Sequence, residues 1–432
     1  MTEITTLERF KAPALKTAAS FVLSEPPCMV LPNGIPVYTF NDQSQETLRF
    51  DLIINAGSAL QQKKLVANST INMLREGSTR YTAGNINAKI DYHGAYIDLQ
   101  SSKDIAWMSV FCLGKSLPLL MPLIESMLKN PSFRQREFRM YNRRQKQDFI
   151  VSSRKNKQIA FRIFNEKLFG IDTPYGQTAA IEDFDKLSTS DLAQFHAKHF
   201  LPANCTIIMS GQINDKIIQT IEKHFGDNWS NAELQTDFIQ ETHFKSGLHQ
   251  IQKPDSLQTS IMMGRPVMQR SHPDYFGFLF LNTILGGYFG SRLMNNIRED
   301  KGFTYGIHSQ VMPYRKACGF LISTEVGTEV TENTLEEIKK ELFRMQNELV
   351  DAEEMALVRN YLNGTYLRAL DGVFNQAEKF RTTLDNKLGM EYFANSLKAI
   401  NAVTAEEIKA LAVKYLSPDD MLTVLVGNLK TT

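Results

Sequence analysis

The sequence has no excess of charge of either sign. Among its 432 residues, 48 Lys and Arg residues are balanced by 47 Asp and Glu residues, for a formal net charge of +1. This balance gives no electrostatic reason to expect nucleic acid or an anionic membrane as a partner. The basic run at residues 143–146 is short and flanked by polar residues, so we interpret it as a solvated helix face.

Cysteine and long apolar runs are also scarce. The four cysteines lie far apart, without a CxxC pair, which argues against a disulfide framework and a thiolate zinc site. No apolar run reaches the ~18 residues of a membrane span. The first 17 residues contain no apolar segment typical of a signal peptide. We therefore expect a cytoplasmic protein without a membrane partner.

An internal repeat is present. Residues 187–211 (LSTSDLAQFHAKHFLPANCTIIMSG) and residues 403–427 (VTAEEIKALAVKYLSPDDMLTVLVG) align without a gap at an offset of half the chain. Each segment combines a capped helix, a proline turn, an apolar β-rich run and a closing glycine. We interpret the chain as two homologous halves, residues 1–215 and 249–432, joined by a linker at residues 216–248.

The order of apolar patterns indicates the fold class. In each half, strand-like segments come first and helical segments follow, without the regular βαβ alternation of a parallel sheet. We predict an α+β protein in which each half is a mostly antiparallel sheet with helices packed on one face. Strands are predicted at 29–40, 48–57, 94–113, 260–267, 306–312 and 319–326, and helices at 64–75, 133–149, 273–285, from 291 and from about 334.

The strongest local signature is LGGYFGSRLMNNIREDKGFTYGIHS at residues 285–309. Three glycines, Gly286, Gly287 and Gly290, allow tight turns or close backbone contacts before a short helix. Arg298 leaves the end of that helix and Tyr305 begins the next strand. A guanidinium and a phenol at this spacing can converge on one carbonyl oxygen and stabilise an oxyanion. Taken alone, the block also fits a simple turn with a surface arginine and a half-buried tyrosine.

This block resembles the C-terminal-half signature of the M16 (insulinase/pitrilysin-like) zinc peptidases. LPNGIPVYTF, LIINAGSALQ and FLPANCTIIMSG are similar to three further stretches of that family, so the resemblance extends over nearly the whole chain. It implies the LuxS/M16 metallopeptidase-like fold, with two related halves. The family includes mitochondrial processing peptidase subunits and core proteins of respiratory complexes.

The chain departs from active members at their zinc motif, His-x-x-Glu-His. Asn68 and Asn72 replace the two histidines, and Ile71 replaces the carboxylate. The spacing i, i+3, i+4 keeps these positions on one helix face. Carboxamides are poor zinc ligands, and isoleucine cannot act as a general base. The third ligand of active members aligns best with Asp148, and one carboxylate would not hold zinc. We therefore predict that this chain binds no metal.

The resemblance implies a division of labour between two polypeptides. We predict the non-metal subunit of a heterodimeric peptidase whose partner is a homologous subunit with an intact zinc motif. Arg298 and Tyr305 would then face the partner's zinc across a chamber that admits short or unfolded peptides. The strand region 94–110 aligns with the edge strand to which peptide adds in active relatives.

Two alternatives stay open at this point. One is a catalytically inert structural or peptide-binding homologue, as in respiratory complexes. The other is a self-sufficient homodimeric peptidase that uses Asp148 as one metal ligand.

Overall fold

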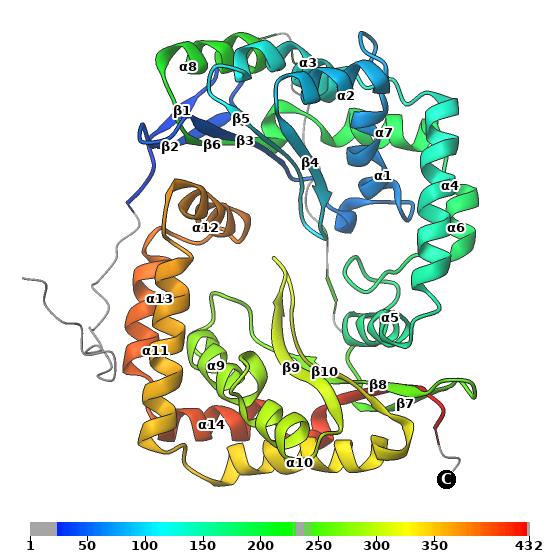
Figure 1. Cartoon of the computed structure of the whole chain (residues 1–432), viewed down its shortest axis with the longest axis vertical. Coiled ribbons are helices and arrows are strands. Elements are labelled where there is room, and N and C mark those ends of the chain that lie inside the picture. The colour runs from blue at the N-terminus through cyan, green and yellow to red at the C-terminus, as the bar shows by residue number, and fades with distance from the viewer. Residues whose placement is uncertain (1–23, 228, 230–237, 239, 242, 430–432) are drawn as a thin grey trace, which may run out of the picture.

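The computed structural model describes residues 24–227, 229, 238, 240–241 and 243–429. Two β-sheets lie at opposite ends of the molecule, and helices connect them along both sides (Figure 1). This arrangement confirms the predicted α+β class with two sheets.

The first sheet contains six strands in the order β1-β2-β6-β3-β5-β4. β2 and β6 pair in parallel and the other neighbours pair antiparallel. One face is covered by a helical layer that includes α1, α2, α3, α7 and α8. The strands are β1 (Cys28–Val30), β2 (Pro36–Asn41), β3 (Thr47–Ile54), β4 (Tyr96–Ser101), β5 (Ala106–Leu113) and β6 (Cys205–Gly211). The helices of this half are α1 (Val66–Met73), α2 (Ala83–Tyr92), α3 (Leu117–Lys129), α4 (Gln135–Ser152), α5 (Asn156–Phe169), α6 (Ile181–Lys186), α7 (Thr189–His199) and α8 (Asp215–Ile221).

The second sheet has the strand order β7-β11-β8-β10-β9, with β7 and β11 parallel and the other pairs antiparallel. This order repeats β2-β6-β3-β5-β4 strand for strand. The strands are β7 (Gly247–Gln252), β8 (Gln258–Pro266), β9 (Thr304–Pro313), β10 (Cys318–Gly327) and β11 (Leu422–Gly427). The helices are α9 (Tyr275–Asn282), α10 (Thr331–Asn347), α11 (Ala352–Arg368), α12 (Val373–Asp385), α13 (Glu391–Ala402) and α14 (Ala405–Tyr415).

The two repeat segments form the same local structure. In each, a capping box opens the helix: Ser188 with Asp191 starts α7, and Thr404 with Glu407 starts α14. A 3₁₀ turn that begins with proline follows, and then a buried strand, β6 or β11. The same sequence pattern therefore produces the same element order at the same place in each sheet.

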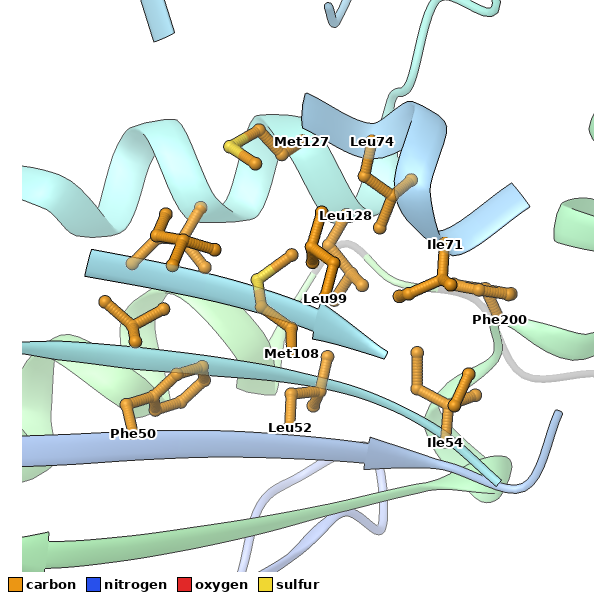
Figure 2. Packing of buried hydrophobic residues seen from close by; sticks show 14 of the residues in the cluster. Phe50, Leu52, Ile54, Ile71, Leu74, Leu99, Met108, Met127, Leu128 and Phe200 are labelled. Carbon is orange, nitrogen blue, oxygen red and sulfur yellow. The ribbon is translucent and has the colours of Figure 1, made fainter. Parts of the chain in front are cut away.

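The core of the first half forms between the sheet and its helices. Alternate strand residues such as Phe50, Leu52 and Ile54 point from β3 into this layer, as a period of two requires (Figure 2). The predicted linker begins inside this core, because α8 and the turn Glu222–Gly226 are helical and pack there through buried apolar residues. Within the described residues the first half therefore extends to Gly226, and much of the remaining predicted linker lies outside them.

Each sheet is covered on its second face by a helix from the other half, which the prediction of helices on one face did not include. α5 packs on β8 and β11 of the second sheet, and α12 packs on β2 and β6 of the first. Apolar side chains fill both contacts, and Arg49 on β3 forms an ion pair with Glu378 on α12 at 2.9 Å. The exchange ties the two halves together.

A third contact joins the tips of two hairpins. The β9–β10 turn reaches the β4–β5 turn, where the backbone N–H of Arg315 donates to Asp104 over 3.1 Å. The Arg315 guanidinium donates to Asn55 and lies 3.7 Å from Asp385. Among the described residues, no helix is both long and apolar enough to cross a bilayer.

Candidate functional site: an arginine and an exposed tyrosine at one end of the second sheet

Arg298 and Tyr305 lie on consecutive elements at one end of the second sheet. Arg298 belongs to a π-helical turn, Met294–Asp300, and Tyr305 is the second residue of β9. Two backbone hydrogen bonds close the connection: Gly302 N–H donates to Arg298 O and Phe303 N–H donates to Ile297 O. Helical segments with π geometry are rare and occur frequently at functional sites.

A β-bulge sets the direction of Tyr305. Ile307 pairs with Thr324, but Thr304 pairs with Val326, so β9 has one extra residue across this interval. In an uninterrupted strand Tyr305 would share the buried side of Ile307. The bulge breaks that alternation, and the Tyr305 side chain is 95% exposed. Bulges often re-aim a side chain in this way beside active sites.

Hydroxyl groups hold the bulge in place. Thr304 Oγ1 donates to Glu325 O at 2.8 Å and accepts from the N–H of Gly306 at 3.1 Å. Thr324 Oγ1, on the neighbouring strand, donates to Gly306 O at 3.0 Å. The exposed position of Tyr305 therefore depends on specific bonds rather than on a frayed strand end.

The Arg298 guanidinium is positioned by its neighbours. It lies 4.6 Å above the centroid of the Phe289 ring, and its Nη1 is 2.7 Å from a carboxylate oxygen of Glu299. Phe289 is itself exposed and follows the glycine pair. Among the residues that the structure describes, the other guanidinium donors have no partner, so they can bond an acceptor from outside.

The three glycines act through close approach. A Cβ at Gly286 would lie 2.7 Å from the backbone nitrogen of Ser309 on β9, and one at Gly287 would lie 3.1 Å from Asn282. A Cβ at Gly290 would lie 2.9 Å from the Tyr288 ring. The glycine-rich segment can therefore rest directly on the strand that carries Tyr305, as the sequence pattern predicts.

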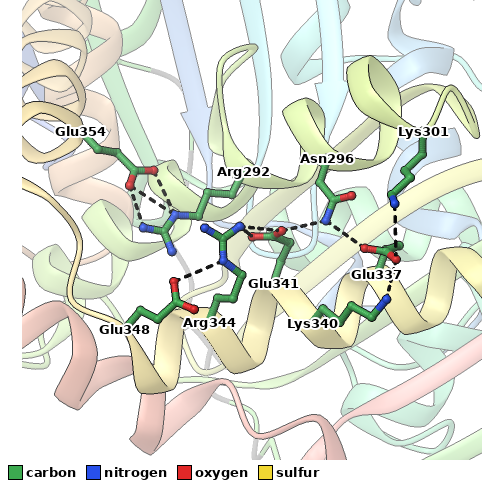
Figure 3. A network of polar contacts seen from close by, with 9 residues as sticks. All are labelled: Arg292, Asn296, Lys301, Glu337, Lys340, Glu341, Arg344, Glu348 and Glu354. Atoms are coloured by element: carbon green, nitrogen blue, oxygen red, sulfur yellow. Dashed lines mark hydrogen bonds and ion pairs between the residues drawn. The ribbon is translucent and has the colours of Figure 1, made fainter.

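A network of polar contacts fixes the turn that bears Arg298 (Figure 3). Asn296 donates to Glu337 at 3.1 Å and to the buried Glu341 at 2.7 Å, both on α10. Arg292 forms a bidentate ion pair with Glu354 on α11, at distances down to 2.7 Å. Sequence analysis missed these partners, because contacts more than 40 residues apart leave no local pattern.

Asn68, Ile71 and Asn72, which the sequence aligns with a zinc motif, all lie on α1 but differ in burial. Asn68 and Asn72 share the outer side of α1, where the Asn72 amide donates to the Asn68 side-chain oxygen at 3.0 Å. Ile71 is 0% exposed and packs in the core with Ile54 and Phe200 (Figure 2). The three positions are neighbours on α1, as the spacing i, i+3, i+4 predicts, but the Ile71 side chain points into the core while the two asparagines border solvent.

Asp148 is exposed on α4 and has no hydrogen bond or ion pair within the described part of the chain. No group of three His, Cys, Asp or Glu side chains that could hold a metal occurs among the described residues. The donors at these positions, two carboxamides and a single carboxylate, do not fit zinc.

β4 forms the free edge of the first sheet, as the aligned strand of active relatives would. Tyr96, at its start, is exposed and stacks loosely on Phe111 of β5, with ring centroids 6.1 Å apart. α1, the helix of the degenerate motif, packs beside β4. An edge strand presents unpaired backbone groups to which an extended peptide can add.

Comparison with known proteins agrees with this arrangement. Residues 186–362 match the family described as peptidase M16 inactive domain. The uncharacterized zinc protease YmxG of Bacillus subtilis is 19% identical over 399 residues, covering 91% of this chain and 96% of that protein. Residues 186–362 are thus similar to the M16 inactive domain, and most of the chain is similar in sequence to a protein named a zinc protease.

Two solved structures share the fold. The peptidase M16 inactive domain from Pseudomonas fluorescens matches with a TM-score of 0.83 and 23% identity, over 93% of this chain and 98% of that one. The periplasmic protease PqqL of Escherichia coli matches with a TM-score of 0.77 and 14% identity, over 95% of this chain and 46% of that one. Both likenesses support the LuxS/M16 metallopeptidase-like architecture.

Proposed function

We propose that this chain is the non-metal subunit of a heterodimeric M16 zinc peptidase. Its partner is a homologous subunit with an intact His-x-x-Glu-His motif, which binds the zinc ion and supplies the general base. Arg298 and Tyr305 of this chain donate hydrogen bonds to the scissile carbonyl oxygen as it becomes an oxyanion. The substrates are short or unfolded peptides.

The observation that carries the proposal is the bulge at Tyr305. Two threonine hydroxyls hold a phenol 95% exposed, where it makes no hydrogen bond within the described residues. A buried position on β9 would stabilise the chain more, since fully burying a large apolar side chain contributes ~1.5–3 kcal/mol. A phenol held in solvent without a partner among the described residues, on the element that follows the one bearing Arg298, suits an acceptor that arrives from outside.

The size of the fold also supports a second subunit. This structure corresponds to 46% of PqqL, so that single chain has room for another unit of similar size. In the proposed complex, a separate polypeptide takes the place of that other unit.

The test begins with affinity purification of the full chain from its host and identification of the protein recovered at one-to-one stoichiometry. Tyr305→Phe in the recovered complex removes only a hydroxyl. We expect assembly and stability to stay within ~0.5 kcal/mol of wild type, because the hydroxyl makes no hydrogen bond to the described residues. Peptide hydrolysis should fall ~10²–10³-fold, the usual cost of one oxyanion donor.

Tyr92→Phe is the matched control, since Tyr92 is an 86% exposed tyrosine on α2. It should leave hydrolysis unchanged. Near wild-type activity of the Tyr305→Phe complex would contradict the catalytic role. Recovery of the chain alone, inert and without metal, would instead support a structural or peptide-binding homologue, and about one zinc per chain would support the homodimer.

A further inference from the structure

A pocket of about 370 Å³ lies where α4, α5 and the segment after Gln177 meet the β9–β10 turn. We call it the α4–α5 pocket. Its volume is within the range of small-ligand sites, and it sits at the junction of the two halves, a common place for such sites. The lining residues are Lys103, Phe149, Ser152, Ser153, Gln158, Ile159, Phe161, Arg162, Asn165, Gln177, Thr178, Ala179 and Tyr314.

The charge of this lining is one-sided. Lys103 and Arg162 are its two charged residues, and no carboxylate is part of it. Arg162 makes no hydrogen bond or ion pair within the described residues. The Lys103 ammonium donates to a single backbone oxygen, that of Gln177, at 3.1 Å. The pocket therefore has cationic donors without an anionic acceptor.

Burial disfavours the charged form of Lys103, which has no anionic partner among the described residues of the pocket. Desolvation lowers the pKa of Lys103 to about 8, although Asp104 next to it opposes the shift. The two Asp104 oxygens are already used by the Tyr175 hydroxyl and the Arg315 N–H. An anion bound in the pocket would restore favourable interactions for the ammonium.

The side-chain oxygen of Asn165 is a third polar group of the lining, and it lacks a hydrogen-bond donor among the described residues. Asn165 is 9% exposed, and its amide nitrogen donates to Phe161 O at 3.0 Å. Its side-chain oxygen is buried and accepts no hydrogen bond in the described part of the chain. A buried acceptor without a partner is unfavourable, so a ligand N–H that meets this oxygen once the amide turns toward the cavity would be favourable.

The rest of the lining is apolar and aromatic. Phe149, Phe161 and Tyr314 contribute rings, and Phe161 is 36% exposed at the surface. Such a lining suits a large apolar side chain. The pocket lining therefore complements a ligand that combines an anionic group, an N–H donor and an apolar side chain.

We propose that the α4–α5 pocket binds the C-terminal residue of a peptide that ends in an aromatic or large aliphatic amino acid. The terminal carboxylate pairs with Arg162 and Lys103, the last amide N–H donates to Asn165, and the side chain packs among the three rings. A peptide C-terminus carries all three features on adjacent atoms.

This site is distinct from the Arg298/Tyr305 pair. Tyr314 lies nine residues after Tyr305 along β9 and its turn, a distance of about 30 Å at the rise of an extended strand. Binding in the pocket requires neither the partner subunit nor its zinc. Its test can therefore fail without affecting the proposed catalytic role, and the reverse is also true.

Calorimetric titration of the purified full chain with N-acetyl-Ala-Ala-Phe tests the proposal. We expect the free acid to bind and the C-terminal amide of the same peptide to bind at least about tenfold more weakly, because it loses a charge-assisted pair. Arg162→Met and Lys103→Met should each weaken the free acid by a similar factor, since methionine keeps the apolar stem of the side chain.

Lys157→Met is the matched control, since Lys157 is an exposed cation on the same helix that does not line the pocket. It should leave the affinity unchanged, and circular dichroism confirms that each variant is folded. Equal binding of acid and amide, or no binding below about 10 mM, would overturn the proposal. So would 3-phenylpropionate binding as tightly as the peptide acid, because that compound lacks the N–H donor.

Discussion

The exchange of helices between the halves predicts that the chain unfolds as one unit. α5 belongs to the first half in sequence, but its Phe164 is completely buried against the second sheet. A Cβ added at Gly264 on β8 would lie only 3.0 Å from the tip of the Phe164 ring. Phe164→Ala therefore removes packing between the halves without touching either sheet's own hydrogen bonds.

The size of the effect follows from the burial. Truncating a fully buried phenylalanine costs ~3–5 kcal/mol, against a total stability of ~5–15 kcal/mol for a typical domain. If the described chain unfolds together, its unfolding entropy at ~2.1 cal/mol/K per residue is ~0.85 kcal/mol/K. The midpoint of thermal unfolding should then fall by ~4–6 °C.

The two tryptophans make this measurable. Trp107 lies on β5 and Trp229 packs against the first core, so tryptophan fluorescence reports the first half. Far-ultraviolet circular dichroism reports both halves. We expect Phe164→Ala to lower both midpoints equally, although Phe164 contacts the second sheet. Phe161→Ala, on the same helix but 36% exposed, should cost less than about 1 kcal/mol.

Separate transitions would refute this reasoning. If the tryptophan signal of Phe164→Ala kept its wild-type midpoint while the dichroism signal split into two steps, the halves would be independent units. The exchanged helices would then contribute little to the coupling between them.

Two further predictions concern buried positions. Ile71→Glu should lower the free energy of unfolding by about 4 kcal/mol at pH 7 and by less at pH 5, because the buried carboxyl must stay protonated, which costs ~1.36 kcal/mol per pH unit above its pKa in the unfolded chain. Urea unfolding measures this change, with Ile71→Leu as the near-neutral control. A glutamate variant as stable as wild type would show that position 71 is not in the core. Burial raises the pKa of Asp385 to about 6, despite Arg315 and Arg381 nearby, and Asp104 and Glu378 raise it further. The folded state then holds a proton that the unfolded state has lost, so the contribution of Asp385 to the free energy of unfolding grows by about 1 kcal/mol as pH falls from 7 to 5. Asp385→Asn should remove that part of the pH dependence. An unchanged dependence of the urea midpoint on pH in this variant would contradict the prediction.

The local structure could be predicted because its causes are close together in the sequence. The capping box at Ser188 and its counterpart at Thr404 each act within four residues, and strand alternation acts within two. The prediction that Asn68 and Asn72 stand where zinc peptidases have histidines rests on side-chain chemistry alone. The repeat and the α+β class could both be predicted on these grounds.

The tertiary structure decided what depends on distant contacts. Arg49 meets Glu378 across 329 residues, and α5 covers a sheet that begins almost 80 residues after the helix ends. The bulge that exposes Tyr305 depends on Thr324 of another strand, and the α4–α5 pocket combines Lys103, Arg162 and Tyr314 from three separate segments. None of these contacts has a sequence period, because each pairs residues that only the folded chain brings together.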